Sequence, residues 1–142
     1  MKLITTINEQ FALDTNILIY LEGNDISKRK IAEILLSYDP VIPAQVISEF
    51  INVIRRLRNI PKNQILVETS AIFRNCSIAP IKQSTLDLAK NLIDKYDFQI
   101  FDSIVVASAL EADCTILYSE DMQHNMYVYQ QLKIINPFIS NQ

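Results

Sequence analysis

The chain reads Phe11-Ala12-Leu13-Asp14-Thr15-Asn16 near its start, where a short apolar stretch runs directly into an acid. Three more acids stand at the ends of predicted strands or one helix beyond them, namely Glu49, Asp102 and Asp121. In an open parallel sheet, the carboxyl ends of the strands open onto one crevice. The order and placement of these four acids therefore predict that they converge on a single site.

Four carboxylates at one site carry a large electrostatic cost. One pair of like charges about 4 Å apart costs on the order of 4 kcal/mol at an effective dielectric of about 20. A fold keeps such a cluster only when bound cations or protons neutralise it. Because carboxylates are hard oxygen ligands, the sequence points to Mg²⁺ or Mn²⁺.

Strand-like and helix-like segments alternate along the chain. The predicted strands cover residues 11–14, 41–42, 76–81, 114–118 and 133–135, and the predicted helices cover 16–21, 27–38, 43–58, 61–75, 84–96 and 101–111. Such alternation is typical of an α/β fold, in which helices cover both faces of a parallel sheet. The helix over 43–58 places Glu49 near an apolar face that includes Val46, Phe50 and Leu57, where an acid without a partner is costly.

Length and composition suit one soluble globular unit. The chain has 142 residues, so we expect a single domain over 1–142. Hydrophobic residues make up 49% of the chain, enough for a packed core, yet no apolar run reaches the roughly 18 residues of a membrane span. Residues 1–10 have no sustained apolar segment, which argues against a signal peptide. These features predict a cytoplasmic protein that does not enter membranes.

Two scarce residue types disfavour further classes of site. The only glycine is Gly23, whereas phosphate-binding loops and dinucleotide-binding turns need several glycines. The two cysteines, Cys76 and Cys114, lie far apart and have no metal-ligand spacing. We expect them to be small, reduced residues of the core.

The charge balance limits how the chain could contact nucleic acid. Its net charge is −3 and its isoelectric point is about 5.1. These values argue against non-specific nucleic-acid binding through overall positive charge, but they allow binding at a local site. A solvated helix end is the ordinary interpretation of a short basic cluster. The chain has one such cluster, and it consists of Arg55, Arg56, Arg58 and Lys62.

Each acid taken alone has an ordinary structural explanation. Asp14 fits an Asx-turn, Asp102 and Asp121 fit helix caps, and Glu49 fits an exposed helix position. The joint pattern favours a functional site, because all four acids fall where the sheet would gather them. The acids are accompanied by polar neighbours that could orient a carboxylate or hold a water, and these are Thr15, Asn16, Ser48 and Ser119.

Four short motifs, taken in order, resemble the PIN domain and, within it, toxin ribonucleases of the VapC type. They are Asp14-Thr15-Asn16, Ser48-Glu49, Phe101-Asp102-Ser103-Ile104-Val105-Val106-Ala107-Ser108-Ala109 and Leu117-Tyr118-Ser119-Glu120-Asp121. The resemblance spans residues 11–137, nearly the whole chain. It implies that the four acids occupy the acidic positions of the family, and that Asn16 and Ser119 are its accompanying polar residues.

The same resemblance implies a three-layer α/β/α sandwich with a central parallel sheet, usually of five strands. It implies Mg²⁺- or Mn²⁺-dependent cleavage of RNA phosphodiester bonds, with Asp14, Glu49, Asp102 and Asp121 as metal ligands and catalytic groups. It also implies inhibition by a cognate antitoxin protein, and a homodimer. With RNA as substrate, Arg55 and Arg56 become candidate contacts to the RNA backbone.

The motifs depart from the family pattern in two places. Phe101-Asp102-Ser103 stands where the family often has Trp-Asp-Ala, and it keeps the aspartate. Gln123-His124-Asn125 stands where Gln-His-Gly is common, and Asn tolerates the positive φ of such a turn. His124 is the only histidine, and we expect it to make a local hydrogen bond in a loop rather than act as a general base.

Glu120 lies directly before Asp121 and makes the position of the fourth acid ambiguous. The spacing from Ser119 favours Asp121. The favoured mechanism is metal-assisted hydrolysis, in which bound ions lower the pKa of a water and no protein nucleophile is needed.

Two other classes of function stay open: a non-catalytic interaction module, and a metal-dependent phosphatase or phospho-acceptor domain. A non-catalytic PIN-fold module that acts through a protein partner would be marked by the loss of an acid, whereas this chain keeps all four. A phospho-acceptor domain would carry an adjacent Asp pair at the end of the first strand, which Leu13-Asp14-Thr15 lacks. A metal-dependent phosphatase of the haloacid dehalogenase type would carry a second Asp at the position of Asn16.

Overall fold

The computed structural model describes residues 9–139 of the chain. Residues 1–8, which hold most of the segment in which we expect no signal peptide, lie outside the described residues, as do the last residues of the expected 1–142 domain. The strands are β1 (Phe11–Leu13), β2 (Val41–Pro43), β3 (Ser77–Ala79), β4 (Ile116–Tyr118), β5 (Tyr127–Val128) and β6 (Leu132–Ile135). The helices are α1 (Thr15–Leu18), the 3₁₀-helix η1 (Ile19–Glu22), α2 (Ile26–Ser37), α3 (Ala44–Leu57), α4 (Lys62–Ile72), α5 (Gln83–Tyr96) and α6 (Ile100–Glu111).

In the described part of the chain, the strands form one six-stranded sheet with the order β3-β2-β1-β4-β6-β5. Neighbouring strands are parallel except β5 and β6, which are antiparallel. The predicted α/β fold with a central parallel sheet is therefore confirmed. The usual count of five strands is corrected by β5, which adds a short antiparallel edge.

The chain reverses its direction of travel across the sheet between β1 and β4. From β1 it continues to β2 and β3 on one side, and it then returns to β4 on the other side. Leu13 pairs with Tyr118, and the backbone N–H of Asp14 donates to the Tyr118 carbonyl at 3.0 Å. Loops that leave neighbouring strands at such a reversal open a crevice. Asp14 and the residues that follow Tyr118 therefore lie side by side.

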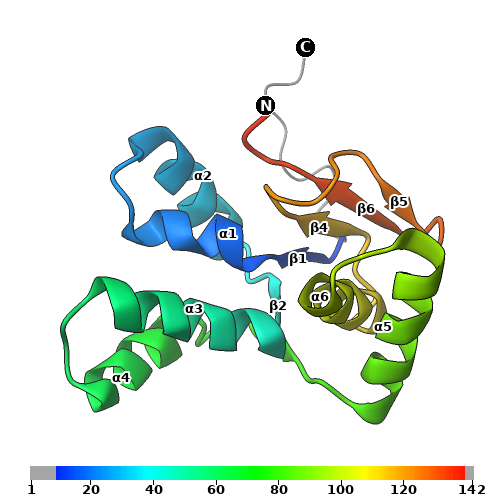
Figure 1. The fold of residues 1–142 in the computed structure, drawn as a ribbon. Helices are drawn as coiled ribbons and strands as arrows, with labels where there is room; N and C mark the ends of the chain where they lie inside the picture. Colours follow the sequence, from blue (N-terminus) through cyan, green and yellow to red (C-terminus); the bar gives the residue numbers. More distant parts are fainter. Residues whose placement is uncertain (1–8, 140–142) are drawn as a thin grey trace.

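Helices flank this sheet (Figure 1). α5 and α6 pack against each other on one side, whereas η1 with α2 and α3 with α4 form two pairs on the side of the carboxyl ends of β1 and β2. In α6, every residue over 103–110 is buried except Ile104, which explains the apolar run in the sequence. Within residues 9–139, no helix combines the length and the hydrophobicity needed to cross a bilayer.

α3 carries one of the predicted acids beside a buried stripe. The helix begins directly after Pro43, and its buried residues Val46, Phe50 and Ile54 recur every four positions. Glu49 is half-buried next to this stripe. The expectation that Leu57 is buried is wrong: its side chain is 63% exposed, because the helix ends at this residue and the chain turns toward α4.

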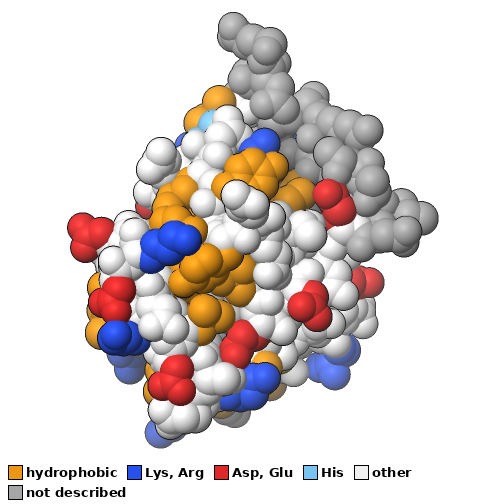
Figure 2. Space-filling model, turned by 90° about the vertical axis from the view of Figure 1, so that its right-hand side faces the viewer, with side chains coloured by type: hydrophobic (Ala, Val, Ile, Leu, Met, Phe, Trp, Pro, Cys, Tyr) orange, Lys and Arg blue, Asp and Glu red, His pale blue; other side chains and the backbone are white. Residues whose placement is uncertain are grey.

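The hairpin of β5 and β6 is an element that the sequence pattern does not predict. Its turn places Tyr129 and Gln130 at φ values of 50° and 56°, and the N–H of Gln131 donates to the carbonyl of Val128 at 3.0 Å. Turns of this kind usually contain Asn or Gly. Here a tertiary contact supports the turn, because the N–H of Tyr129 donates to the hydroxyl of Tyr96 at 2.8 Å. Figure 2 shows this side of the molecule, where hydrophobic side chains gather between acidic and basic ones.

Candidate active site

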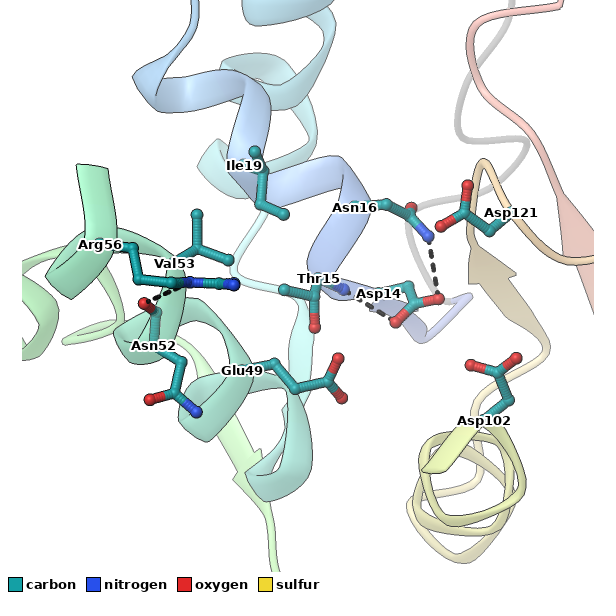
Figure 3. Close-up of a pocket in the computed structure, with 10 residues that line it drawn as sticks. All are labelled: Asp14, Thr15, Asn16, Ile19, Glu49, Asn52, Val53, Arg56, Asp102 and Asp121. Carbon is teal, nitrogen blue, oxygen red and sulfur yellow. Dashed lines mark hydrogen bonds between the residues drawn. The ribbon is translucent and has the colours of Figure 1, made fainter. Parts of the chain in front are cut away.

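A pocket of about 280 Å³ opens at the carboxyl ends of β1 and β4, beside α1, α3 and the first turn of α6. Figure 3 shows acids reaching it from four places in the fold: Asp14 after β1, Glu49 on α3, Asp102 on α6 and Asp121 after β4. The structure thus brings together the four acids that the sequence singles out. The other residues that line the pocket are Thr15, Asn16, Ile19, Asn52, Val53 and Arg56.

Asp14 is enclosed and held in one orientation. Its side chain accepts three hydrogen bonds: Oδ1 from the Thr15 N–H at 2.8 Å, and Oδ2 from the Ser119 hydroxyl at 2.9 Å and the Asn16 amide at 3.2 Å. The Asn16 amide also donates to Ser119 Oγ at 3.3 Å. Asn16 and Ser119, two of the four polar neighbours named from the sequence, therefore act on the orientation of this carboxylate.

Four acids and one basic residue, Arg56, are among the residues that line the pocket. Burial raises the pKa of Asp14 to about 6, against the hydrogen bonds from Ser119 and Thr15, and the charges of Asp102 and Glu49 add to the rise. Burial also raises the pKa of Asp102, and the charge of Asp121 is the second cause. Both shifts show that the site disfavours full ionisation of its acids and favours protons or cations.

Glu120 and Asp121 adjoin in the sequence but have different surroundings. Glu120 accepts a hydrogen bond from the Tyr20 hydroxyl at 2.6 Å and forms an ion pair with Lys28 at 2.7 Å. Burial by itself would raise the pKa of Glu120, but these two bonds outweigh it and lower the pKa. Asp121, in contrast, lines the pocket. No sequence motif signals Tyr20 or Lys28, because they meet Glu120 only in the folded chain.

One end of the pocket is basic. Arg56 lines it and reaches toward Thr15 (Figure 3), and its Nε donates to the Asn52 carbonyl at 3.4 Å. Arg55 is exposed and is not among the residues that line the pocket. Of the two arginines proposed from the sequence as RNA contacts, the structure therefore places Arg56 at the pocket and Arg55 away from it. Asn52 is a further polar residue of this wall that the sequence analysis did not identify.

Arg58, from the same basic cluster, makes structural ion pairs. Its guanidinium lies 2.6 Å from Glu68 on α4 and 3.4 Å from Glu22 at the end of η1. These contacts connect the end of α3 to both neighbouring helices. They help to fix the spacing of the elements on either side of the pocket.

His124 and Asn125 lie in the segment between β4 and β5. The Nδ1 atom of His124 accepts a hydrogen bond from the backbone N–H of Asn136 at 2.9 Å, and His124 does not line the pocket. Asn125 adopts a φ of 68°, so it takes the left-handed conformation that Asn tolerates better than most residues. His124 thus makes a hydrogen bond as expected, but its partner lies 12 positions along the chain, beyond β5 and β6, and the absence of a general-base role stays a prediction.

The profile of the PIN domain matches residues 11–127, most of the chain. The chain belongs to the PIN domain family. No curated protein sequence matches it significantly. PIN domains are typically ribonucleases, and they are generally metal-dependent.

Solved structures similar to this PIN domain include proteins of toxin–antitoxin systems. A toxin–antitoxin complex from Klebsiella pneumoniae has a TM-score of 0.69 at 17% identity, over 91% of this chain and 98% of that chain. FitAcB from Neisseria gonorrhoeae has a TM-score of 0.65 at 15% identity, over 91% and 99%. VapC20 of Mycobacterium tuberculosis, a sarcin–ricin loop cleaving toxin, has a TM-score of 0.61 at 14% identity, over 79% and 90%. At these identities the similarity shows a shared fold.

The pocket of this PIN domain has the oxygen donors that suit a hard cation. Its four acids supply carboxylate oxygens, and the Thr15 hydroxyl is buried with no hydrogen-bond partner among the described residues. Within residues 9–139, however, no three His, Cys, Asp or Glu side chains form a ready-made metal-binding group. The acids stand around the space instead of meeting in it, as expected for carboxylates that repel one another.

Proposed function

We propose that this PIN domain is a Mg²⁺- or Mn²⁺-dependent endoribonuclease that hydrolyses RNA phosphodiester bonds, and that it is the toxin of a toxin–antitoxin pair. The observation that carries the proposal is the pocket lined by Asp14, Glu49, Asp102 and Asp121, in which burial raises the pKa of Asp14 to about 6. A purely structural cluster would pair its acids with lysine or arginine, as Glu120 pairs with Lys28. The charge left over in this pocket supports a cation as its occupant.

The four acids and the two polar residues that contact Asp14 have distinct roles in this proposal. Asp14, Glu49, Asp102 and Asp121 hold the cation, and Asn16 and Ser119 keep Asp14 in its orientation through the hydrogen bonds described above. A bound Mg²⁺ or Mn²⁺ supplies activation of a water and stabilisation of charge on the phosphate. The chain needs no nucleophile of its own.

The basic end of the pocket supports a substrate with several phosphates. Arg56 lies on the same wall as Val53 and Asn52, next to the acids and not on a remote surface. A guanidinium suits the oxygens of a phosphate, and phosphate contacts position nucleic acid without reading its sequence. Arg56 would hold a phosphate that neighbours the one cleaved, which favours RNA over a small phosphate monoester.

The protein partners are proposed from the similarity to toxin–antitoxin complexes and from the resemblance to VapC-type toxins. We propose a cognate antitoxin as inhibitor and a homodimer as the assembled form. An apolar groove along α3, α4 and the edge strand β3 supports a protein contact, since Leu66 and Ile78 in it are 60% and 54% exposed. The molar mass in solution tests the dimer. The parent should have the mass of two chains, and Leu66→Glu, which places a charge in the groove, should have the mass of one.

The test of the proposed activity is cleavage of structured RNA by the purified protein, with Mg²⁺ or with EDTA. Parent protein should cleave only with metal, and Asp102→Asn should lose activity. Asp87→Asn serves as the matched control, because Asp87 is exposed on α5 and does not line the pocket. Cleavage that continues in EDTA would refute the mechanism. Absence of cleavage by parent protein that still binds an antitoxin would favour the non-catalytic module.

A further inference from the structure

The Thr15 hydroxyl is an unusual feature of the pocket. Thr15 is 5% exposed, lines the pocket, and its Oγ1 has no hydrogen-bond partner among the described residues. Buried hydroxyls nearly always find a partner, and one left without a partner requires an explanation. In Figure 3 its oxygen points toward Glu49, into the space between the acids.

The position of Thr15 in the fold explains why the chain itself offers no partner. Thr15 is the first residue of α1, and Asp14 is its N-cap. A threonine inside a helix can bond to a carbonyl of the preceding turn, but at the start of a helix no preceding turn exists. The Thr15 N–H is already used by Asp14 Oδ1 at 2.8 Å. The hydroxyl is therefore directed to whatever occupies the pocket.

The chemistry of the neighbours indicates what the hydroxyl would meet. Ionised carboxylates only accept hydrogen bonds, so they hold a cation but offer no donor to the oxygens around it. A water or a phosphate oxygen bound to that cation has lone pairs that a hydroxyl can satisfy. Thr15 supplies such a donor on the Glu49 side of Asp14, and Arg56, which is on α3 like Glu49, reaches toward it.

We propose that the Thr15 hydroxyl is a binding group of the active site that donates a hydrogen bond to an oxygen coordinated by the cation, either a water or a phosphodiester oxygen. The inference rests on the proposed function of the pocket as a Mg²⁺ or Mn²⁺ site. It assigns to the second residue of Asp14-Thr15-Asn16 a role beyond the orientation of its neighbours.

The decisive variants are Thr15→Val, which keeps the shape and removes the hydroxyl, and Thr15→Ser, which restores it. Ser108→Ala is the matched control, because Ser108 Oγ is also buried without a hydrogen-bond partner but lies on α6 away from this pocket. For each protein, free Mn²⁺ is titrated by electron paramagnetic resonance, with and without dimethyl phosphate, and the melting temperature is recorded in EDTA.

In EDTA, Thr15→Val should melt no lower than the parent, because the lost hydroxyl had no partner in the metal-free fold. Its Mn²⁺ affinity, measured alone or with dimethyl phosphate, should fall about 10-fold in at least one of the two conditions, the size of effect typical for groups that support metal ligands. Thr15→Ser should recover most of that affinity, and Ser108→Ala should bind Mn²⁺ as the parent does. Weaker binding of Mn²⁺ alone identifies a coordinated water as the acceptor, whereas a loss seen only with dimethyl phosphate identifies a phosphate oxygen.

Three outcomes would overturn the inference, and they are distinguishable. If the parent binds Mn²⁺ and Thr15→Val binds it equally with and without dimethyl phosphate, only the role of Thr15 fails. If the parent does not bind Mn²⁺ at all, the proposed function fails with it. A lower melting temperature of Thr15→Val in EDTA would show that the hydroxyl has a structural partner, which also contradicts the inference.

Discussion

The Ser119 hydroxyl donates a hydrogen bond of 2.9 Å to Asp14 Oδ2, although the two residues stand 105 positions apart in the chain. The contact follows from the pairing of β1 with β4, in which Leu13 lies opposite Tyr118. Each strand ends one residue before its polar partner, so the sheet itself sets their separation. The orientation of the most buried acid of the pocket is thus a property of the sheet.

The stability of the metal-free protein should depend on pH through Asp14. Its pKa is raised from 3.8 to about 6, so its contribution to stability is fully present below about pH 4 and is lost as the pH rises through about 6. The Asp14→Asn variant has no carboxyl group at this position, so it does not lose this part of the stability as the pH rises. Relative to the parent, the variant should gain roughly 1 to 1.5 kcal/mol of unfolding free energy between pH 5 and pH 8. Urea unfolding in EDTA at both pH values measures it, and Asp87→Asn should show no such gain.

Divalent metal should stabilise the folded protein. A ligand that binds only the folded state at about 100 times its dissociation constant adds about 2.7 kcal/mol. Millimolar Mn²⁺ should therefore raise the melting temperature of the parent by several degrees. Asp14→Asn, Asp102→Asn and Asp121→Asn should melt no lower than the parent in EDTA and should respond less to Mn²⁺. A parent protein indifferent to Mn²⁺ would contradict the metal site.

The neighbours Glu120 and Asp121 should give opposite results when neutralised. Glu120→Gln breaks the ion pair with Lys28 and weakens the bond from Tyr20, so it should melt lower than the parent and keep its response to Mn²⁺. Asp121→Asn should keep its melting temperature in EDTA and lose activity by roughly a hundredfold, about 3 kcal/mol of transition-state stabilisation. Thermal melts and RNA cleavage on both variants separate the two roles. Equal loss of metal response in both would mean that the fourth acid is misassigned.

The two adjacent arginines should differ in their effect on RNA. Arg56→Ala removes a guanidinium that lines the pocket, so it should weaken RNA binding and reduce the slope of affinity against salt by about one. Arg55→Ala removes an exposed charge outside the pocket and should change both values little. Both substitutions are made in the catalytically inactive Asp102→Asn protein, and RNA binding is measured at several salt concentrations. Identical behaviour of the two variants would argue against an RNA backbone contact in the pocket.

The proposed biology predicts that the protein is harmful when produced alone. Expression of the parent should arrest growth, because no antitoxin is present to hold it inactive. Asp14→Asn should relieve the arrest by removing an acid from the pocket, with equal amounts of both proteins verified by immunoblot. Equal growth with the parent and the variant would count against the toxin assignment, while other nuclease roles would stay open.

The sequence by itself determined the fold class and the four acids of the pocket. Both depend on local information: alternating strand and helix patterns imply a parallel sheet, and an acid directly after an apolar strand is carried to its carboxyl edge. The apolar run that became α6 likewise placed Asp102 at a helix start. The hairpin at Tyr129 could not be predicted from local sequence, because its turn lacks the usual Asn or Gly and depends on the hydroxyl of Tyr96.

Only the tertiary structure decided which polar atoms are paired and which are left facing the pocket. Glu120 differs from its neighbour Asp121 because its side chain pairs with Lys28, which lies 92 positions away in the chain. Arg56 lines the pocket and Arg55 does not, because they lie on different faces of α3. The Thr15 hydroxyl has no partner among the described residues, because Thr15 is the first residue of a helix. These outcomes depend on contacts between distant segments, and the free energy of a buried polar atom is set by the partner it meets there.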